Sequence, residues 1–250
     1  MPEVSVIVVT FESRDELECL RPLRDSDFRD FEVVLRDDEG ISRARNEGIR
    51  EAAADKLVFL DDDAIPCDGW LETVSTLLEE HDVVAGRVED PRDHFFSKMG
   101  NNRGYDQGDD PGEAETLVGC NMAFRRDVFE TVGTFDENID FGHEETLFAE
   151  RVREEYEIHY SPDLVVEHEF GNTPVSWWKK QLQYGPADVY RAKKLDEPVF
   201  TDWYELVPVS GGSSLSEVVV KTAGKTLRNV SRVNAMIRGV PTPQTESRGE

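Results

Sequence analysis

Three consecutive aspartates, Asp61 to Asp63, are the residues in this sequence that are best suited to carry out chemistry. In a chain with 53 acidic residues such a run proves little by itself, because a solvated acidic face is the common explanation. Their position is more informative, since they directly follow Lys56 to Leu60, an apolar segment with the pattern of a buried strand. Ligands of open α/β sheets gather at the carboxyl ends of strands. Carboxylates without His or Cys nearby in the sequence favour Mg²⁺ or Mn²⁺, which often bridge to substrate phosphates.

The segments around these aspartates alternate short apolar runs with amphipathic ones. This pattern predicts an α/β fold, a mostly parallel sheet flanked by helices. The predicted strands are Val4–Val9, Phe31–Leu35, Lys56–Leu60 and Val83–Val88, followed later by paired β segments at Ile158–Ser161 and Leu164–His168. The predicted helices begin at an S-x-x-E capping box at Ser13, at Ile41, after Pro66, at Arg126 and at Glu144. Residues 89–115, rich in glycine, are expected to form a loop over a site or a plain surface excursion.

The charge balance of the chain is strongly acidic. Its 28 basic and 53 acidic residues give a formal net charge of -25, a composition that looks halophilic and argues against nucleic acid as a partner. The three cysteines fit neither a disulfide framework nor a zinc site. The sequence contains no apolar run near the ~20 residues of a membrane span and no basic leader before its first strand, so we expect a cytoplasmic protein.

The character of the chain changes near Gly171. Residues 1–170 carry a net charge of -28, whereas residues 171–250 carry +3 and have a helical pattern. We therefore expect a catalytic domain over 1–170, a basic helical extension over 171–238 and a disordered tail over 239–250.

A basic amphipathic helix is predicted within the extension. Its apolar positions recur every three or four residues at Leu215, Val219, Ala223, Leu227, Val230, Val233 and Ile237. One interpretation is peripheral docking on the anionic cytoplasmic leaflet of a membrane, with Trp177 to Lys180 as a second contact. The alternative is that the apolar stripe packs on the acidic domain.

Six short motifs occur in an order that resembles glycosyltransferase family 2. They are VSVIVVTF from Val4, ARNEGI from Ala44, FLDDD from Phe59, GCNMAFRR from Gly119, GTFDE from Gly133, and Glu144-Glu145 followed by Arg151. The resemblance covers about residues 3–170. It implies the GT-A fold, a nucleotide-sugar donor such as a UDP- or GDP-sugar, a divalent metal and inversion at the anomeric carbon.

The resemblance also implies roles for single residues at the donor site. Asp61 and Asp63 match the ends of the D-x-D motif, with Asp63 the expected metal ligand, Asp61 facing the ribose or the metal's water shell, and Asp62 exposed. His168 matches a further metal or diphosphate ligand. The remaining donor contacts implied are Thr10 and Glu12 at the nucleoside, Asp37 or Asp38 at the base, and Arg45 at the diphosphate. Only seven residues separate Asp37 from Arg45, fewer than the family usually has.

The general base implied by the resemblance is Glu145, with Glu144 as an adjacent rival. It would take the proton from an acceptor hydroxyl as that hydroxyl attacks the donor sugar. We therefore expect an inverting, metal-dependent transferase acting on a glycan acceptor, lipid-linked, in surface-glycan assembly or protein N-glycosylation.

Three alternatives remain open at this point. A polyprenyl-phosphate sugar synthase would need no base, because its acceptor phosphate is already ionised. A nucleotidyltransferase would need a glycine-rich, basic phosphate loop, which Val9 to Arg14 does not provide. A non-catalytic carbohydrate-binding protein would have no use for a site that binds metal and diphosphate.

Overall fold

The computed structural model describes residues 1–10, 17–92, 105–139, 141–169, 173–200, 211–212 and 214–241. The chain forms two compact units. The first contains residues 1–137 and 144–170, and the second contains residues 138–143 and 171–250. The short segment 138–143 therefore packs with the C-terminal helices, although it lies within the sequence of the first unit.

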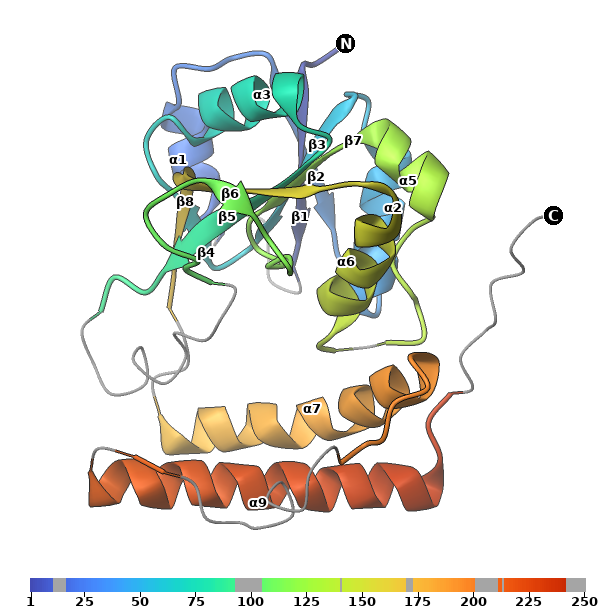
Figure 1. The fold of residues 1–250 in the computed structure, drawn as a ribbon. Helices are drawn as coiled ribbons and strands as arrows, with labels where there is room; N and C mark the ends of the chain where they lie inside the picture. Colours follow the sequence, from blue (N-terminus) through green and yellow to red (C-terminus); the bar gives the residue numbers. More distant parts are fainter. Residues whose placement is uncertain are drawn as a thin grey trace, which may run out of the picture. The chain divides into compact units, whose positions relative to one another are not determined.

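The first unit is built on one eight-stranded sheet (Figure 1). The strand order is β2, β1, β3, β7, β5, β8, β4, and β6 pairs with β8. The strands are β1 Val4–Val9, β2 Phe31–Arg36, β3 Lys56–Asp61, β4 Ala64–Pro66, β5 Val83–Glu89, β6 Gly112–Glu113, β7 Met122–Arg125 and β8 Ile158–His168. Strands β1, β2 and β3 are parallel, as are β5 and β8, whereas β7 is antiparallel to β3 and β5. The predicted α/β class is confirmed, with a mixed sheet.

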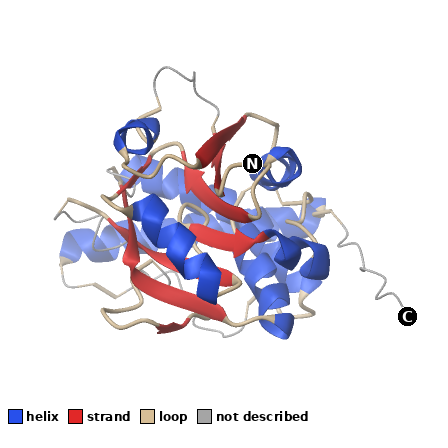
Figure 2. Ribbon diagram, turned by 90° about the horizontal axis from the view of Figure 1, so that it is seen from above, coloured by secondary structure: helices blue, strands red, loops and turns tan. Residues whose placement is uncertain are grey.

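Helices cover both faces of this sheet (Figure 2). They are α1 Leu20–Asp25, α2 Ile41–Glu51, α3 Trp70–Glu80, α5 Arg126–Val132 and α6 Glu144–Glu155. Helices α1 and α3 contribute to one hydrophobic cluster, and α2, α5 and α6 contribute to the other. Strand β1 supplies Val6 to the first cluster and Ile7 to the second. Burial on both faces explains why β1 is a continuous apolar run instead of an alternating one.

The segments Ile158–Ser161 and Leu164–His168 are not paired with each other; they form the single strand β8. Strand β8 runs parallel to β5 along both parts, with a register shift opposite Gly86 and Arg87 that accommodates the intervening residues. The predicted capping box at Ser13 lies outside the described residues, as do residues 93–104 of the glycine-rich segment 89–115.

The second unit contains two long helices, α7 (Pro174–Lys194) and α9 (Leu215–Arg238). They lie side by side and run in the same direction, since Trp177 meets Gly224 and Gly185 meets Ser231 (Figure 1). A Cβ at either glycine would collide with the facing helix, so both glycines are needed for this close approach. Among the helices that the structure describes, none combines the length and hydropathy needed to cross a membrane.

The predicted amphipathic helix is confirmed as α9, and the structure shows where its apolar stripe points. Five aliphatic side chains of the stripe are exposed: Leu215, Val219, Val230, Val233 and Ile237. The side of α9 that meets α7 instead carries Gly224, Arg228 and Ser231.

Candidate active site

Two of the three aspartates and a distant histidine meet at one edge of the sheet. Asp61 ends β3, Asp63 precedes β4, and His168 ends β8. Strands β4 and β8 are antiparallel with Ala64 opposite His168, and this register brings the imidazole beside Asp63. The Nε2 atom of His168 lies 3.1 Å from Oδ1 of Asp63, and one ligand atom from each of the three residues lies within 4.8 Å of the others. Two carboxylates and one imidazole form a donor set suited to a divalent metal ion.

Two of the other predicted donor contacts, Thr10 and Asp37, lie at the same edge. Strands β1, β2 and β3 are in register, with Val9 opposite both Arg36 and Asp61, so their carboxyl ends coincide. Thr10 follows β1; it is buried, and its backbone N–H donates to the carbonyl of Arg36 over 2.9 Å. Asp37 follows β2 and is exposed. A ligand resting on these strand ends would therefore meet Thr10, Asp37 and Asp61 together.

The alternatives at the acidic positions can now be separated by their partners. Asp38 accepts hydrogen bonds from Arg36 at 2.8 and 3.0 Å, which hold its pKa below the ordinary value, whereas Asp37 is exposed. Asp62 is partly exposed and is not part of the metal-ligand group. Glu12 lies outside the described residues.

A buried arginine contacts both a candidate metal ligand and the residue next to the predicted base. Arg45, on α2, is 1% exposed. Its Nη1 donates to Oε1 of Glu144 over 2.9 Å, and its Nη2 lies 3.5 Å from Oδ1 of Asp61. Its guanidinium also lies 5.5 Å from the centre of the Phe135 ring. The guanidinium is thus surrounded by protein groups, and its predicted contact with a diphosphate stays a prediction.

Glu144 and Glu145 begin helix α6, and the structure distinguishes them. Glu144 is buried at 5% exposure and is the partner of Arg45, whereas Glu145 is partly exposed. Burial and the neighbouring Glu144 carboxylate raise the pKa of Glu145 well above its ordinary value, and Arg45 partly opposes the shift. Because Glu144 is paired with Arg45 while Glu145 is partly exposed, Glu145 is the one of the two that an acceptor can reach, and its role as the base stays a prediction.

Two asparagines that sequence reasoning did not single out bond to distant segments of the first unit. Asn46 donates from Nδ2 to the carbonyl of Phe135 over 2.9 Å and accepts from the backbone N–H of Phe135 over 3.0 Å. Asn121 accepts from Nε1 of Trp70 and donates to the carbonyls of Arg87 and Leu164. Both lie inside motifs quoted above, so the motifs were the available signal.

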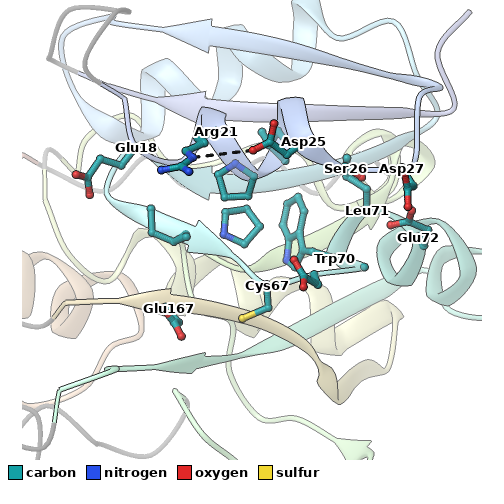
Figure 3. Close-up of a pocket in the computed structure, with 16 residues that line it drawn as sticks. Glu18, Arg21, Asp25, Ser26, Asp27, Cys67, Trp70, Leu71, Glu72 and Glu167 are labelled. Atoms are coloured by element: carbon teal, nitrogen blue, oxygen red, sulfur yellow. Dashed lines mark ion pairs between the residues drawn. The ribbon is translucent and has the colours of Figure 1, made fainter.

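An open pocket lies elsewhere on the first unit, between α1, β4 and the start of α3 (Figure 3). Its volume is about 1230 Å³, and its walls include Pro22, Cys67 and Trp70. Of the predicted site residues that the structure describes, none lines this pocket. The candidate active site is therefore the strand edge and the start of α6.

The mixed sheet with helices on both faces matches the GT-A fold of glycosyltransferases. Among solved structures, the mannosyltransferase PcManGT from Pyrobaculum calidifontis, in complex with GDP-Man and Mn²⁺, has a similar fold. Its TM-score is 0.58 at 18% identity, and the match covers 96% of this chain and 76% of that one.

Residues 13–133 match the family described as Glycosyl transferase family 2. This match spans 121 residues, just under half of the chain, and agrees with the family that the motifs resemble. Glucosyl-dolichyl phosphate glucuronosyltransferase of Haloferax volcanii is 28% identical over 152 residues, which is 54% of this chain and 47% of that protein. The dTDP-rhamnosyl transferase RfbF of Shigella flexneri is 26% identical over 157 residues, 57% of this chain and 53% of that protein. The chain spans about half the length of these curated relatives.

Proposed function

We propose that the chain is an inverting, metal-dependent glycosyltransferase that moves a sugar from a nucleotide-sugar donor to a hydroxyl of a lipid-linked glycan. The observation that carries this proposal is the convergence of Asp61, Asp63 and His168 at the strand edge, with Arg45 linking that edge to the acidic start of α6. One edge of the sheet would then hold the donor, and α6 would serve the acceptor. Residues 1–170 would form the nucleotide-sugar and acceptor domain.

Each side chain has a role that its position supports. Asp63, Asp61 and His168 would hold Mn²⁺ or Mg²⁺, whose chemistry when bound is Lewis-acid stabilisation of the departing nucleoside diphosphate. Thr10 and Asp37 would orient the nucleoside at the strand ends. Because β1, β2 and β3 end in register, Thr10 and Asp37 lie at the same edge of the sheet as Asp61.

Glu145 would accept the proton of the attacking hydroxyl. Its carboxylate is partly exposed and can therefore meet an acceptor. Glu144 would remain the fixed partner of Arg45. General-base catalysis of this kind typically contributes about 10² to 10⁴ in rate.

Two relatives support the finer parts of the proposal. The name of the Haloferax volcanii protein describes a glucuronosyltransferase of glucosyl-dolichyl phosphate, which favours a lipid-linked acceptor. The structure of the Pyrobaculum calidifontis enzyme contains GDP-Man and Mn²⁺, which favours a nucleotide-sugar donor with a divalent ion. A haloarchaeal relative also agrees with the acidic composition and with a place in protein N-glycosylation.

The test is a screen of UDP-, GDP- and dTDP-sugars with Mn²⁺ or Mg²⁺, following release of the nucleoside diphosphate and the mass of the product. Asp63→Ala should abolish metal-dependent donor binding, while Asp62→Ala, a matched change one residue away, should keep it. Normal donor and metal binding by Asp63→Ala would refute the metal site. Transfer to a polyprenyl phosphate by a Glu145→Gln variant at the wild-type rate would favour a polyprenyl-phosphate sugar synthase.

We further propose that the second unit contacts an anionic membrane leaflet. The exposed aliphatic stripe of α9 and the exposed Lys179 and Lys180 of α7 are the features that support this contact. Vesicles of phosphatidylglycerol and phosphatidylcholine should sediment the wild-type protein more than a Val230→Ser, Val233→Ser variant. Equal sedimentation of both would refute the contact.

A further inference from the structure

One guanidinium serves two carboxylates at the candidate site, and all three groups belong to the first unit. Nη1 of Arg45 donates to Oε1 of Glu144 over 2.9 Å, a normal length for a hydrogen bond between charged groups. Nη2 lies 3.5 Å from Oδ1 of Asp61, beyond the ~3.2 Å limit of a good hydrogen bond. The guanidinium is therefore bonded to Glu144, and it acts on Asp61 mainly through its charge.

The surroundings of Arg45 leave its guanidinium few other positions. The side chain is buried, and the backbone at Gly119 approaches it so closely that a Cβ there would collide with Nη2. The centre of the Phe135 ring lies 5.5 Å from the guanidinium carbon. A buried cation without a partner is strongly destabilising. If Glu144 lost its charge, Asp61 would be the carboxylate left within ion-pair distance among the residues that the structure describes.

Asp61 is also a member of the candidate metal-ligand group. Its carboxylate, that of Asp63 and the imidazole of His168 can each offer one atom to a divalent ion. A guanidinium that hydrogen-bonds to Asp61 would compete with such an ion, because both are cations that need the same carboxylate. We propose that Glu144 is a positioning residue for this metal site, which binds Arg45 and so keeps the guanidinium from hydrogen-bonding to Asp61. This inference rests on the proposed function, in which the three ligands hold the ion.

The test measures binding of Mn²⁺ to the full chain without donor, by electron paramagnetic resonance of the free ion in molar KCl, which screens distant charges. Glu144→Gln keeps the size of the side chain and removes its charge. We expect the affinity for Mn²⁺ to fall about tenfold, because the ion must then displace a hydrogen bond between charged groups. Glu150→Gln is the matched control, since it removes an exposed carboxylate from the same helix and should leave the affinity unchanged.

A double variant separates this competition from a loss of stability or of charge. Arg45→Met combined with Glu144→Gln removes the buried cation together with its partner, and replacing both members of a buried pair is often neutral for folding. Without a guanidinium to compete for Asp61, the double variant should bind Mn²⁺ about as tightly as the wild-type protein. A double variant as weak as Glu144→Gln, or wild-type affinity in Glu144→Gln, would overturn the inference. If Glu144→Gln does not fold, a double variant weaker than the wild-type protein would overturn it alone.

The two proposals fail in different ways. A wild-type protein that binds no Mn²⁺ refutes the metal site of the proposed function, and the role of Glu144 falls with it. A wild-type protein that binds Mn²⁺, with a Glu144→Gln variant of equal affinity, refutes only the role of Glu144.

Discussion

Removing Arg45 should cost far more stability than removing another arginine of the same helix. Arg45→Met keeps much of the aliphatic volume but leaves the buried Glu144 carboxylate without the guanidinium at 2.9 Å. Loss of one partner from a buried ion pair typically costs about 3–5 kcal/mol. Arg50, also on α2, pairs with Glu47, and these side chains are 57% and 35% exposed. Arg50→Met should therefore cost less than about 1 kcal/mol.

Urea unfolding in molar KCl, followed by tryptophan fluorescence, would measure both variants. The expected result is a lower midpoint for Arg45→Met with an unchanged slope, because the denatured state is the same. Gly119→Ala tests the same pair without removing it. A Cβ at residue 119 would collide with the Arg45 guanidinium, and overpacking of this kind costs about 1–3 kcal/mol. If Arg45→Met lost no more stability than Arg50→Met, the reasoning from the buried pair would be wrong.

Three further predictions concern catalysis, salt and thiol chemistry. Glu145→Gln should lower kcat about 10²- to 10⁴-fold at unchanged donor affinity, whereas Glu144→Gln should mainly lower the melting temperature; an active Glu145→Gln would move the base to Glu144. With a net charge of -25, the melting temperature should rise from about 0.1 to about 2 M KCl as the charges are screened, and a flat profile would refute the halophilic interpretation. Ellman's reagent should modify Cys67 quickly and the other two cysteines slowly, because Cys19 and Cys120 are buried. Burial also raises the pKa of the Cys19 thiol to about 12. Three equal rates of modification would contradict this packing.

The elements of the first unit could be predicted from sequence where their residues face a core. The run Val4–Val9 predicts a strand because each side chain is buried, and the helical spacing from Ile41 predicts α2 because one face packs on the sheet. The pairing of Ile158–Ser161 with Leu164–His168 was wrong, because an irregularity within a strand looks like a turn in sequence. The position of β7 between β3 and β5 could not be predicted, because local periodicity does not show which strands are neighbours in a sheet.

The residues of the candidate site could be predicted from the family resemblance. The contacts that support these residues could be seen only in the structure. Residues such as Asn46 and Asn121 bond to backbone carbonyls far away in the sequence, and such bonds have no periodic pattern to reveal them.

The pairing of β4 with β8 also bears on how the chain folds. Ala64 lies opposite His168, so the candidate metal ligands Asp63 and His168 come together only across about a hundred residues of intervening chain. During synthesis, β1, β2 and β3 emerge early. The candidate metal site at the end of β3 stays incomplete until β8, which carries His168, joins the sheet. Full affinity for a divalent ion would then distinguish a completely folded chain from one in which β8 has not yet joined the sheet.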